Sequence, residues 1–312
     1  MRTSFALAIV FALATPALAA DPAPPEDAAT DESQSLTLAK QRMTVNVKIN
    51  DKGPYPFVVD TGAENTMIAR ELADELALRD GPQRVLHSIG ATRNVRTAVI
   101  PHLSANRIVS RNIVASTVGK NNLGSVGILG LSTLKSQRML LDFKSGAMTL
   151  TPSNEKQETW EGESITVTAQ SRLGQLILTD ASIEKDRIWV ILDTGNDVTV
   201  GNLALQKLLT KRGVGGNAGN SIGLIDVNGA VTQFDYVIVN RMRIASIAFE
   251  NLPMGFADAR IFNVLGLKGQ PALLLGMDVL KMFGRVSIDF GNRKVRFQRT
   301  EVYEPPATAA TN

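Results

Sequence analysis

Residues 57–63 read FVVDTGA, and residues 190–196 read VILDTGN. Each stretch is an apolar run that ends in the same Asp-Thr-Gly triplet, at Asp60 and at Asp193. Apolar runs of this length are typical of buried strands, so both acids are expected directly after a strand. One such triplet is usually only a turn, but two copies in matching surroundings indicate an internal repeat.

The likeness between the two halves continues beyond the triplets. Stretches with apolar residues at helical spacing begin nine residues after each acid, at Ala69 and at Asn202. Further along, residues 128–135 read ILGLSTLK and residues 274–281 read LLGMDVLK. The repeat therefore covers most of the chain and is not confined to one motif.

Each copy closes with a hairpin signal, in which Asp142 and Asp289 are predicted to form turns rather than to act as catalytic acids. Ser132 and Asp278 are expected to cap short helices at their N-termini. Between its acid and its apolar-apolar-Gly element, the second copy is about thirteen residues longer than the first. We assign this extra length to residues 253–269.

The remaining segments of the repeat alternate apolar and polar residues, which is typical of half-buried strands. Short strands separated by turn residues predict an all-β fold of two lobes with a few short helices. A parallel α/β sheet would need a helix between successive strands, and such helices are missing from the pattern. We assign residues 38–154 to an N-terminal lobe and residues 155–300 to a C-terminal lobe. The alternating segments are residues 43–49, 96–103, 175–183 and 234–244.

The two ends of the chain lie outside this repeat. An unbroken apolar run at residues 5–14, followed by ALA at 17–19, predicts that residues 1–20 are a secretory signal peptide. An uncleaved anchor is less favoured, because the run is far below the roughly 20 residues that span a bilayer. Residues 21–37 are predicted to be a disordered linker and residues 301–312 a flexible tail. We therefore expect a periplasmic or secreted protein with no stable membrane insertion after signal cleavage.

Composition narrows the possible chemistry. The 312 residues include no cysteine and only two histidines, His87 and His102. This excludes disulfides, iron–sulfur clusters and thiolate zinc sites, and it leaves little for an imidazole-based metal centre. The 33 Lys and Arg residues nearly balance the 30 Asp and Glu residues without a dense basic run, so nucleic acid is not an expected partner. We expect neither a metal nor an organic cofactor.

The two triplets, each after an apolar strand and each followed by an apolar-apolar-Gly element, resemble those of the pepsin-like and retropepsin-like aspartic peptidases. The resemblance covers residues 38–300. The Asp-Thr-Gly-Ala of the first copy is similar to the single-lobed retroviral and bacterial form, whereas two lobes in one chain resemble the pepsin arrangement. This implies two β-barrel lobes related by a pseudo-two-fold axis. It also implies a monomer, because one chain carries both acids.

In this family two carboxyl groups share one proton and activate a water molecule for attack on a peptide bond. The resemblance implies that Asp60 and Asp193 form this catalytic pair. The Gly of each triplet allows close approach of the backbone, and the Thr hydrogen-bonds across to the opposite loop. The residues expected to support the pair are Thr61, Gly62, Ala63, Thr194, Gly195 and Asn196.

The sequence departs from the pepsin pattern at two places. Where pepsin-like lobes carry Ser or Thr after the triplet, the second copy has Asn196, whose amide can donate to the neighbouring carboxylate or turn its acceptor toward it. An acceptor would disfavour the charged acid and move the working pH toward neutrality. The hairpin predicted at residues 86–96 lacks the flap tyrosine of pepsins, and Gly90 is placed in this flap as a substrate contact. His87 and Arg93 are candidates to cover the cleft.

The sequence therefore predicts an aspartic endopeptidase that hydrolyses extended polypeptides, held in the cleft by main-chain hydrogen bonds. The alternative is a catalytically inactive periplasmic peptide-binding module that retains the fold. Both departures favour the alternative, and both complete triplets favour the enzyme.

Overall fold

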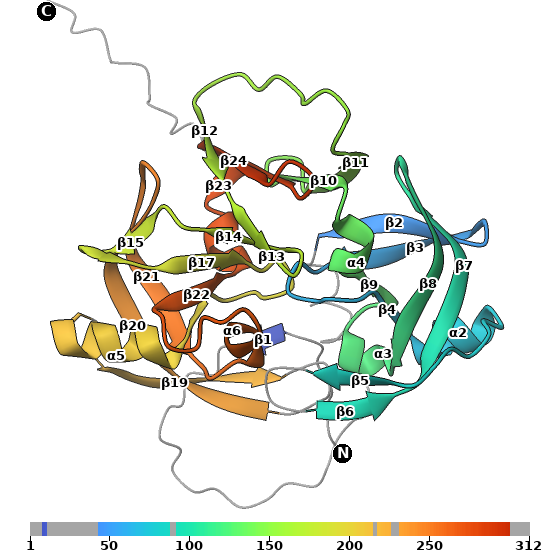
Figure 1. The fold of residues 1–312 in the computed structure, drawn as a ribbon, viewed down its shortest axis with the longest axis horizontal. Coiled ribbons are helices and arrows are strands. Elements are labelled where there is room, and N and C mark those ends of the chain that lie inside the picture. The colour runs from blue at the N-terminus through green and yellow to red at the C-terminus, as the bar shows by residue number, and fades with distance from the viewer. Residues whose placement is uncertain (1–7, 11–42, 88–91, 215–216, 226–230, 300–312) are drawn as a thin grey trace, which may run out of the picture.

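The computed structural model describes residues 8–10, 43–87, 92–214, 217–225 and 231–299. They form two β-rich lobes, the first drawn in blue and green and the second in yellow to red, with one sheet shared above them (Figure 1). The predicted all-β, two-lobed fold is confirmed. Among the described residues, no helix is long and apolar enough to cross a membrane.

The first lobe is built on a closed barrel whose strands follow the order β2–β3–β9–β4–β8–β7. The sequence TVNVKI of β2 shows why these segments form strands, since Val45, Val47 and Ile49 are buried while the residues between them face solvent. The barrel strands are β2 (Thr44–Ile49), β3 (Lys52–Val59), β4 (Met67–Ala69), β7 (Thr97–Ala105), β8 (Ile108–Val118) and β9 (Gly127–Leu129).

Three short helices and one hairpin complete the first lobe. α2 (Arg70–Glu75) follows β4, α3 (Lys120–Leu123) connects β8 to β9, and α4 (Leu131–Leu134) follows β9. β5 (Arg84–His87) and β6 (Thr92–Val95) form a separate two-stranded sheet, at the lower edge of the molecule in Figure 1.

The second lobe contains an eleven-stranded sheet. Its main path runs β1–β19–β20–β21–β18–β22–β17–β14–β13, with β15 beside β20 and β16 beside β15. Its helices are α5 (Leu203–Arg212), α6 (Arg260–Val264) and α7 (Met277–Leu280). Its strands are β1 (Ala8–Val10), β13 (Gln170–Arg172), β14 (Gln175–Leu178), β15 (Ala181–Ile183), β16 (Asp186–Arg187), β17 (Trp189–Leu192), β18 (Val200–Gly201), β19 (Asn217–Ile225), β20 (Val231–Ile244), β21 (Ile247–Phe256) and β22 (Ala272–Leu275).

The strand β1 belongs to the predicted signal peptide and pairs antiparallel with β19. If residues 1–20 are removed on secretion, as the sequence predicts, this strand is absent from the secreted protein. The rest of the predicted signal peptide, the linker at 21–37 and the tail at 301–312 lie outside the described residues.

A five-stranded sheet joins the two lobes in the order β11–β10–β23–β24–β12. Its strands are β10 (Gln137–Asp142), β11 (Ala147–Pro152), β12 (Ser164–Thr168), β23 (Phe283–Asp289) and β24 (Lys294–Arg299). The first two come from the first half of the chain and the others from the second half. The boundary predicted between residues 154 and 155 lies in the connection from β11 to β12.

Two Arg–Asp pairs cross the centre of this shared sheet in a symmetric pattern. β10 and β23 run antiparallel, so Arg138 lies opposite Asp289 and Asp142 opposite Arg285. The side chains form ion pairs of 3.8 Å and 2.8 Å respectively. Both aspartates also accept backbone N–H groups in the turns that follow them, as the sequence predicts for turn formers. The repeated acids at the hairpins therefore hold turns and join the lobes.

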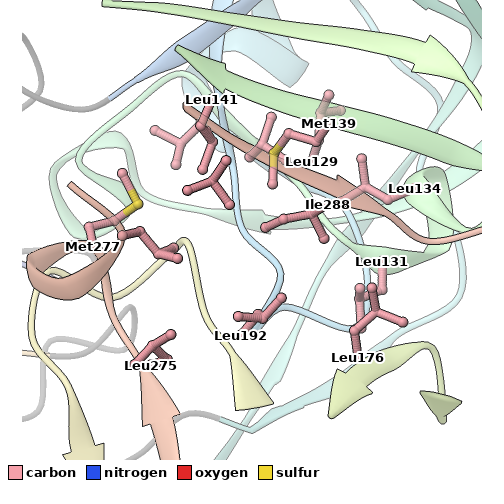
Figure 2. Close-up of a cluster of buried hydrophobic side chains, with 14 of the residues drawn as sticks. Leu129, Leu131, Leu134, Met139, Leu141, Leu176, Leu192, Leu275, Met277 and Ile288 are labelled. Atoms are coloured by element: carbon pink, nitrogen blue, oxygen red, sulfur yellow. The ribbon is translucent and has the colours of Figure 1, made fainter. Parts of the chain in front are cut away.

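One hydrophobic core passes from lobe to lobe beneath the shared sheet. Figure 2 shows Leu129, Leu131 and Met139 of the first half packed with Leu192 and Ile288 of the second. All of these side chains are buried. Because Leu129 and Leu192 end the strands that lead to the candidate site, this packing fixes the two halves of the site relative to each other.

The predicted N-caps at Ser132 and Asp278 are wrong. Helix α4 is preceded by Gly130 and α7 by Gly276, and neither N-terminus receives a side-chain cap. Ser132 and Asp278 are each the second residue of their helix. The carboxylate of Asp278 accepts the backbone N–H of the next residue, Val279, and it also accepts from Thr199, on the loop that follows the second triplet.

The extra length of the second copy is divided between two places, so the assignment of all of it to residues 253–269 is wrong. Helices α2 and α5 both begin ten residues after their acids. The segment from the start of β19 to the start of β20 covers residues 217–230. It is longer than the equivalent segment of the first copy, which covers residues 84–91 before β6. The remainder lies between β21 and β22, in the segment that contains α6.

Candidate active site

Each candidate acid stands at the end of a buried strand. β3 ends at Val59 and is followed by Asp60, while β17 ends at Leu192 and is followed by Asp193. Each strand runs parallel to the apolar strand of its own repeat, β9 or β22. The backbone N–H of each acid donates to the last carbonyl of that strand at 3.0 Å, and each acid is only 4% exposed. The two repeats thus hold their acids in equivalent ways.

The glycines of the triplets bring the two acids together. A Cβ atom on Gly62 would lie 2.7 Å from Oδ1 of Asp193, and a Cβ atom on Gly195 would overlap the carboxyl group of Asp60. Each carboxyl group therefore lies against the backbone of the opposite loop, where no side chain fits. Both acids belong to one site, contributed equally by the two lobes.

The threonines of the triplets lock the two loops with four reciprocal hydrogen bonds. The hydroxyl of Thr61 donates to the carbonyl of Leu192 at 2.8 Å, and that of Thr194 donates to the carbonyl of Val59 at 2.7 Å. Each hydroxyl also accepts the backbone N–H of the other threonine, at 3.0 Å for the Thr61 hydroxyl and 3.2 Å for the Thr194 hydroxyl. These are the cross-loop contacts that the family resemblance implies. All four donors and acceptors are buried, so the loops cannot separate without large cost.

The two acids have different electrostatic surroundings. Oδ1 of Asp60 accepts the N–H groups of Gly62 and Ala63 at 2.7 Å and 3.1 Å, whereas Oδ1 of Asp193 accepts only that of Gly195, at 3.1 Å. Burial raises the pKa of Asp193 well above its usual range, and the adjacent charge of Asp60 raises it further. Burial and the neighbouring Asp60 therefore both favour the protonated form of Asp193.

The side chain of Asn196 is fully buried next to this pair. It contributes the smallest influence on the pKa of Asp193, and this influence lowers the pKa. The expectation that an acceptor of Asn196 raises the working pH stays a prediction. Within the described part of the chain neither amide atom makes a hydrogen bond of good geometry, so this influence is weaker than that of a direct donor.

A second layer of polar contacts supports each loop from behind, six residues after the acid. In the first lobe, the hydroxyls of Thr66 and Thr133 are 2.7 Å apart. In the second lobe, Thr199 donates both its hydroxyl and its backbone N–H to the carboxylate of Asp278, at 2.8 Å and 2.9 Å. Burial raises the pKa of Asp278. Sequence reasoning missed this layer, although the threonine recurs at the same distance from both acids.

The two acids open into a cavity of about 490 Å³ between the lobes. The β5–β6 hairpin forms one wall with Arg84, Val85, Leu86 and His87. The opposite wall comes from the second lobe, where Ala259, Arg260, Ile261 and Val264 lie in or next to α6. A cavity of this size, with apolar and basic side chains on both walls and acids on its floor, can hold several residues of an extended chain.

The hairpin that the sequence predicts over residues 86–96 is present as β5 and β6. Gly90 and the other residues between the two strands, 88–91, lie outside the described residues. His87 lines the cavity, and its Nδ1 lies 3.0 Å from Oγ1 of Thr92 across the hairpin. Arg93, in contrast, lines a separate cavity.

Sequence reasoning did not identify α6 as part of the site. The signal was present, because part of the extra length of the second copy lies between β21 and β22. Val85 and Arg84, which line the same cavity from the other lobe, are far away in sequence, and no local pattern indicates that they share a site with α6. Val85 and Val264 remain about half exposed, at 52% and 47%, although both are apolar.

Comparison with known families gives one match. The family model described as aspartyl protease matches residues 45–133 and 179–279, which together make up more than half of the chain. Each matched stretch contains one triplet and one apolar-apolar-Gly element. No curated protein matches the chain. Within the described residues, no group of three or more His, Asp or Glu side chains is arranged to hold a metal ion.

Proposed function

This chain belongs to the aspartyl protease family, and from that premise we propose that it is an aspartic endopeptidase with Asp60 and Asp193 as its catalytic pair. The observation that carries the proposal is the reciprocal contact of the two triplets. It brings two buried carboxyl groups from separate lobes to the floor of one cavity. A purely structural role would leave this matched pair of buried acids without a purpose.

The different surroundings of the two acids support a division of roles. Asp193, with its raised pKa, holds the proton, and Asp60 acts as the base. Asp60 takes a proton from the attacking water while the oxygen of that water bonds to the carbon of the scissile carbonyl. Asp193 gives its proton to the carbonyl oxygen in the same step. Asp60 then passes its proton to the leaving nitrogen as the C–N bond breaks. Asp193 regains a proton from the hydroxyl group as the new carboxylic acid forms.

The cleft supports an extended peptide as the substrate. Strand edges of the β5–β6 hairpin lie along one wall, and an extended chain can form main-chain hydrogen bonds with such an edge. The half-exposed Val85 and Val264 offer apolar contacts from opposite walls. Substrate side chains that alternate in direction would meet these two walls in turn.

We further propose that the protein acts in the periplasm or outside the cell and works as a monomer. The first part rests on the predicted signal peptide at residues 1–20, and the second on the presence of both acids in one chain. Activity per molecule should stay constant on dilution. A steep fall would argue for a functional dimer.

The test is to incubate the purified chain from residue 21 onward with a diverse peptide library between about pH 3 and pH 7. Cleavage is read by mass spectrometry. The proposal expects cuts at internal peptide bonds. Peptides that bind but stay intact at every pH would instead favour an inactive peptide-binding module.

A further inference from the structure

A second cavity, the arginine pocket, lies beside the candidate active site. It has a volume of about 470 Å³, and its polar lining consists of Arg70, Arg93, Asn94, Arg96, Thr117 and Asn122. Arg70 lies in α2, Arg93 and Asn94 in β6, Arg96 between β6 and β7, Thr117 in β8 and Asn122 in α3. Segments between residues 70 and 122 therefore bring three guanidinium groups to one hollow.

The charges in the arginine pocket are not balanced by its own lining, which contains no carboxylate. Arg96 is paired with Asp80, which lies outside the lining, at 2.8 Å. Within the part of the chain that the structure describes, Arg70 and Arg93 form no ion pair. Two unpaired guanidinium groups in one hollow repel each other, and a bound anion removes that repulsion.

The arginine pocket shares its supporting strands with the active-site cavity. Leu86 lines the active-site cavity, and its cross-strand partner Arg93 lines the arginine pocket. Ser116 and Thr117 are likewise consecutive residues of β8 that line the two cavities in turn. A peptide that lies along the hairpin over the two acids therefore passes within a few residues of the arginines.

We infer that the arginine pocket binds an Asp or Glu side chain of the substrate, so that acidic peptides are selected. The inference rests on the proposed function. The planar fork of Arg donates two parallel hydrogen bonds to a carboxylate, and amide donors from Asn94 and Asn122 fit the same group. Neighbouring residues of the hairpin and of β8 line both cavities, which favours a carboxylate carried by the peptide over a free anion.

The test measures binding without turnover. Fluorescent peptides from the same diverse library are bound to the full chain carrying Asp60→Asn. In each peptide, one position at a time holds either Glu or the uncharged Gln. We expect Glu to bind about tenfold more tightly than Gln at one position, on one side of the scissile bond. Raising the salt from about 50 mM to about 500 mM should reduce this ratio, because exposed charges are screened.

The decisive variant adds Arg70→Gln and Arg93→Gln to the same protein. We expect the Glu-to-Gln ratio to fall to about one, while the affinity for the Gln peptide stays unchanged. Arg187→Gln, which removes the same charge from an exposed strand of the second lobe, should leave the ratio intact. Equal melting temperatures establish that the variants are folded.

Equal binding of Glu and Gln peptides at every position would overturn the inference, as would a preference that survives the double substitution. Competition by free glutamate as strong as by the peptide would also overturn it, since the site would then serve a free anion. Turnover by the unsubstituted protein is measured separately. Cleavage without acid preference refutes only the arginine pocket, and acid-selective binding without cleavage refutes only the proposed function.

Discussion

The two lobes carry the same triplet but surround it differently. The first acid, Asp60, accepts two backbone N–H groups and is followed by the small residue Ala63. The second acid, Asp193, accepts one and is followed by the buried amide of Asn196. The repeated backbone therefore brings the acids together, and burial next to the charge of Asp60 favours the protonated form of Asp193. A symmetric pair would leave the base and the acid undefined.

The walls of the cleft differ as well. The first lobe contributes a hairpin that carries basic residues, and the second contributes α6 from part of its extra length. Duplication therefore accounts for the floor of the site, whereas the segments that differ between the copies account for its walls. Substrate choice should depend on the walls, and catalysis on the floor.

Substitution of the triplet glycines should have the largest effect on activity, because each glycine faces the acid of the other lobe. Gly195→Ala pushes a methyl group into the carboxyl group of Asp60, and Gly62→Ala does the same to Asp193 with slightly more room. Displacing an acid by about 1 Å should reduce kcat at least about 100-fold, with Gly195→Ala the more severe. Gly269→Ala, where a Cβ meets open space, is the matched control. Activity within a few-fold of wild type would show that the acids do not face the opposite glycines.

A second, smaller effect is expected from the reciprocal hydrogen bonds of the two triplet threonines, and it tests whether both lobes contribute equally to them. Thr61→Val or Thr194→Val removes one donated and one accepted hydrogen bond and leaves buried backbone groups unpaired. Each should lower the free energy of unfolding by about 2–4 kcal/mol, and the double variant by less than the sum. Thr210→Val, on an exposed helix face, should change it by less than about 0.5 kcal/mol. Urea titration measures the free energy of unfolding of all four variants. Additive losses in the double variant would mean that the two threonines do not act as one unit.

The third test compares the polar contacts behind the two loops, which Thr133 makes in the first lobe and Asp278 in the second. Burial makes the pKa of Asp278 higher in the folded protein than in the unfolded chain. Its contribution to stability is then complete below the unfolded pKa and is lost as the pH rises through the folded one. Asp278→Asn should therefore flatten the fall in stability from about pH 4 to pH 7. Thr133→Val, in the first lobe, should leave the slope unchanged. An unchanged slope in Asp278→Asn would show that this carboxyl group is not held near its protonated form.

Much of this comparison could be predicted from the sequence. Apolar runs before Asp60 and Asp193, and period-two alternation elsewhere, are local signals, so they identify strands and the repeat directly. The N-caps at Ser132 and Asp278 could not be placed correctly, because the short helices begin directly after a glycine. That α6 and Val85 line the same cavity depends on how the lobes pack, which no local pattern encodes.

The smallest effect concerns Asn196, which lowers the pKa of Asp193. Asn196→Ala makes the second loop resemble the first and removes that influence, so the pKa of Asp193 should rise. The basic limb of the pH–rate profile, where the acid loses its proton, should move to higher pH. Asn154→Ala, at an exposed position, should leave the profile unchanged. A shift to lower pH would show that the amide acceptor, and not its donor, faces the acid.

The most direct test of the whole account compares Asp60→Asn and Asp193→Asn with wild type on one cleaved peptide. Both acids are required, so each variant should lose at least about 1,000-fold in kcat while its melting temperature changes little. Asp186→Asn, which removes a partly exposed acid that is paired with Arg212, serves as the control and should keep full activity. Activity near that of wild type in either dyad variant would contradict the assignment of Asp60 and Asp193 as the catalytic pair.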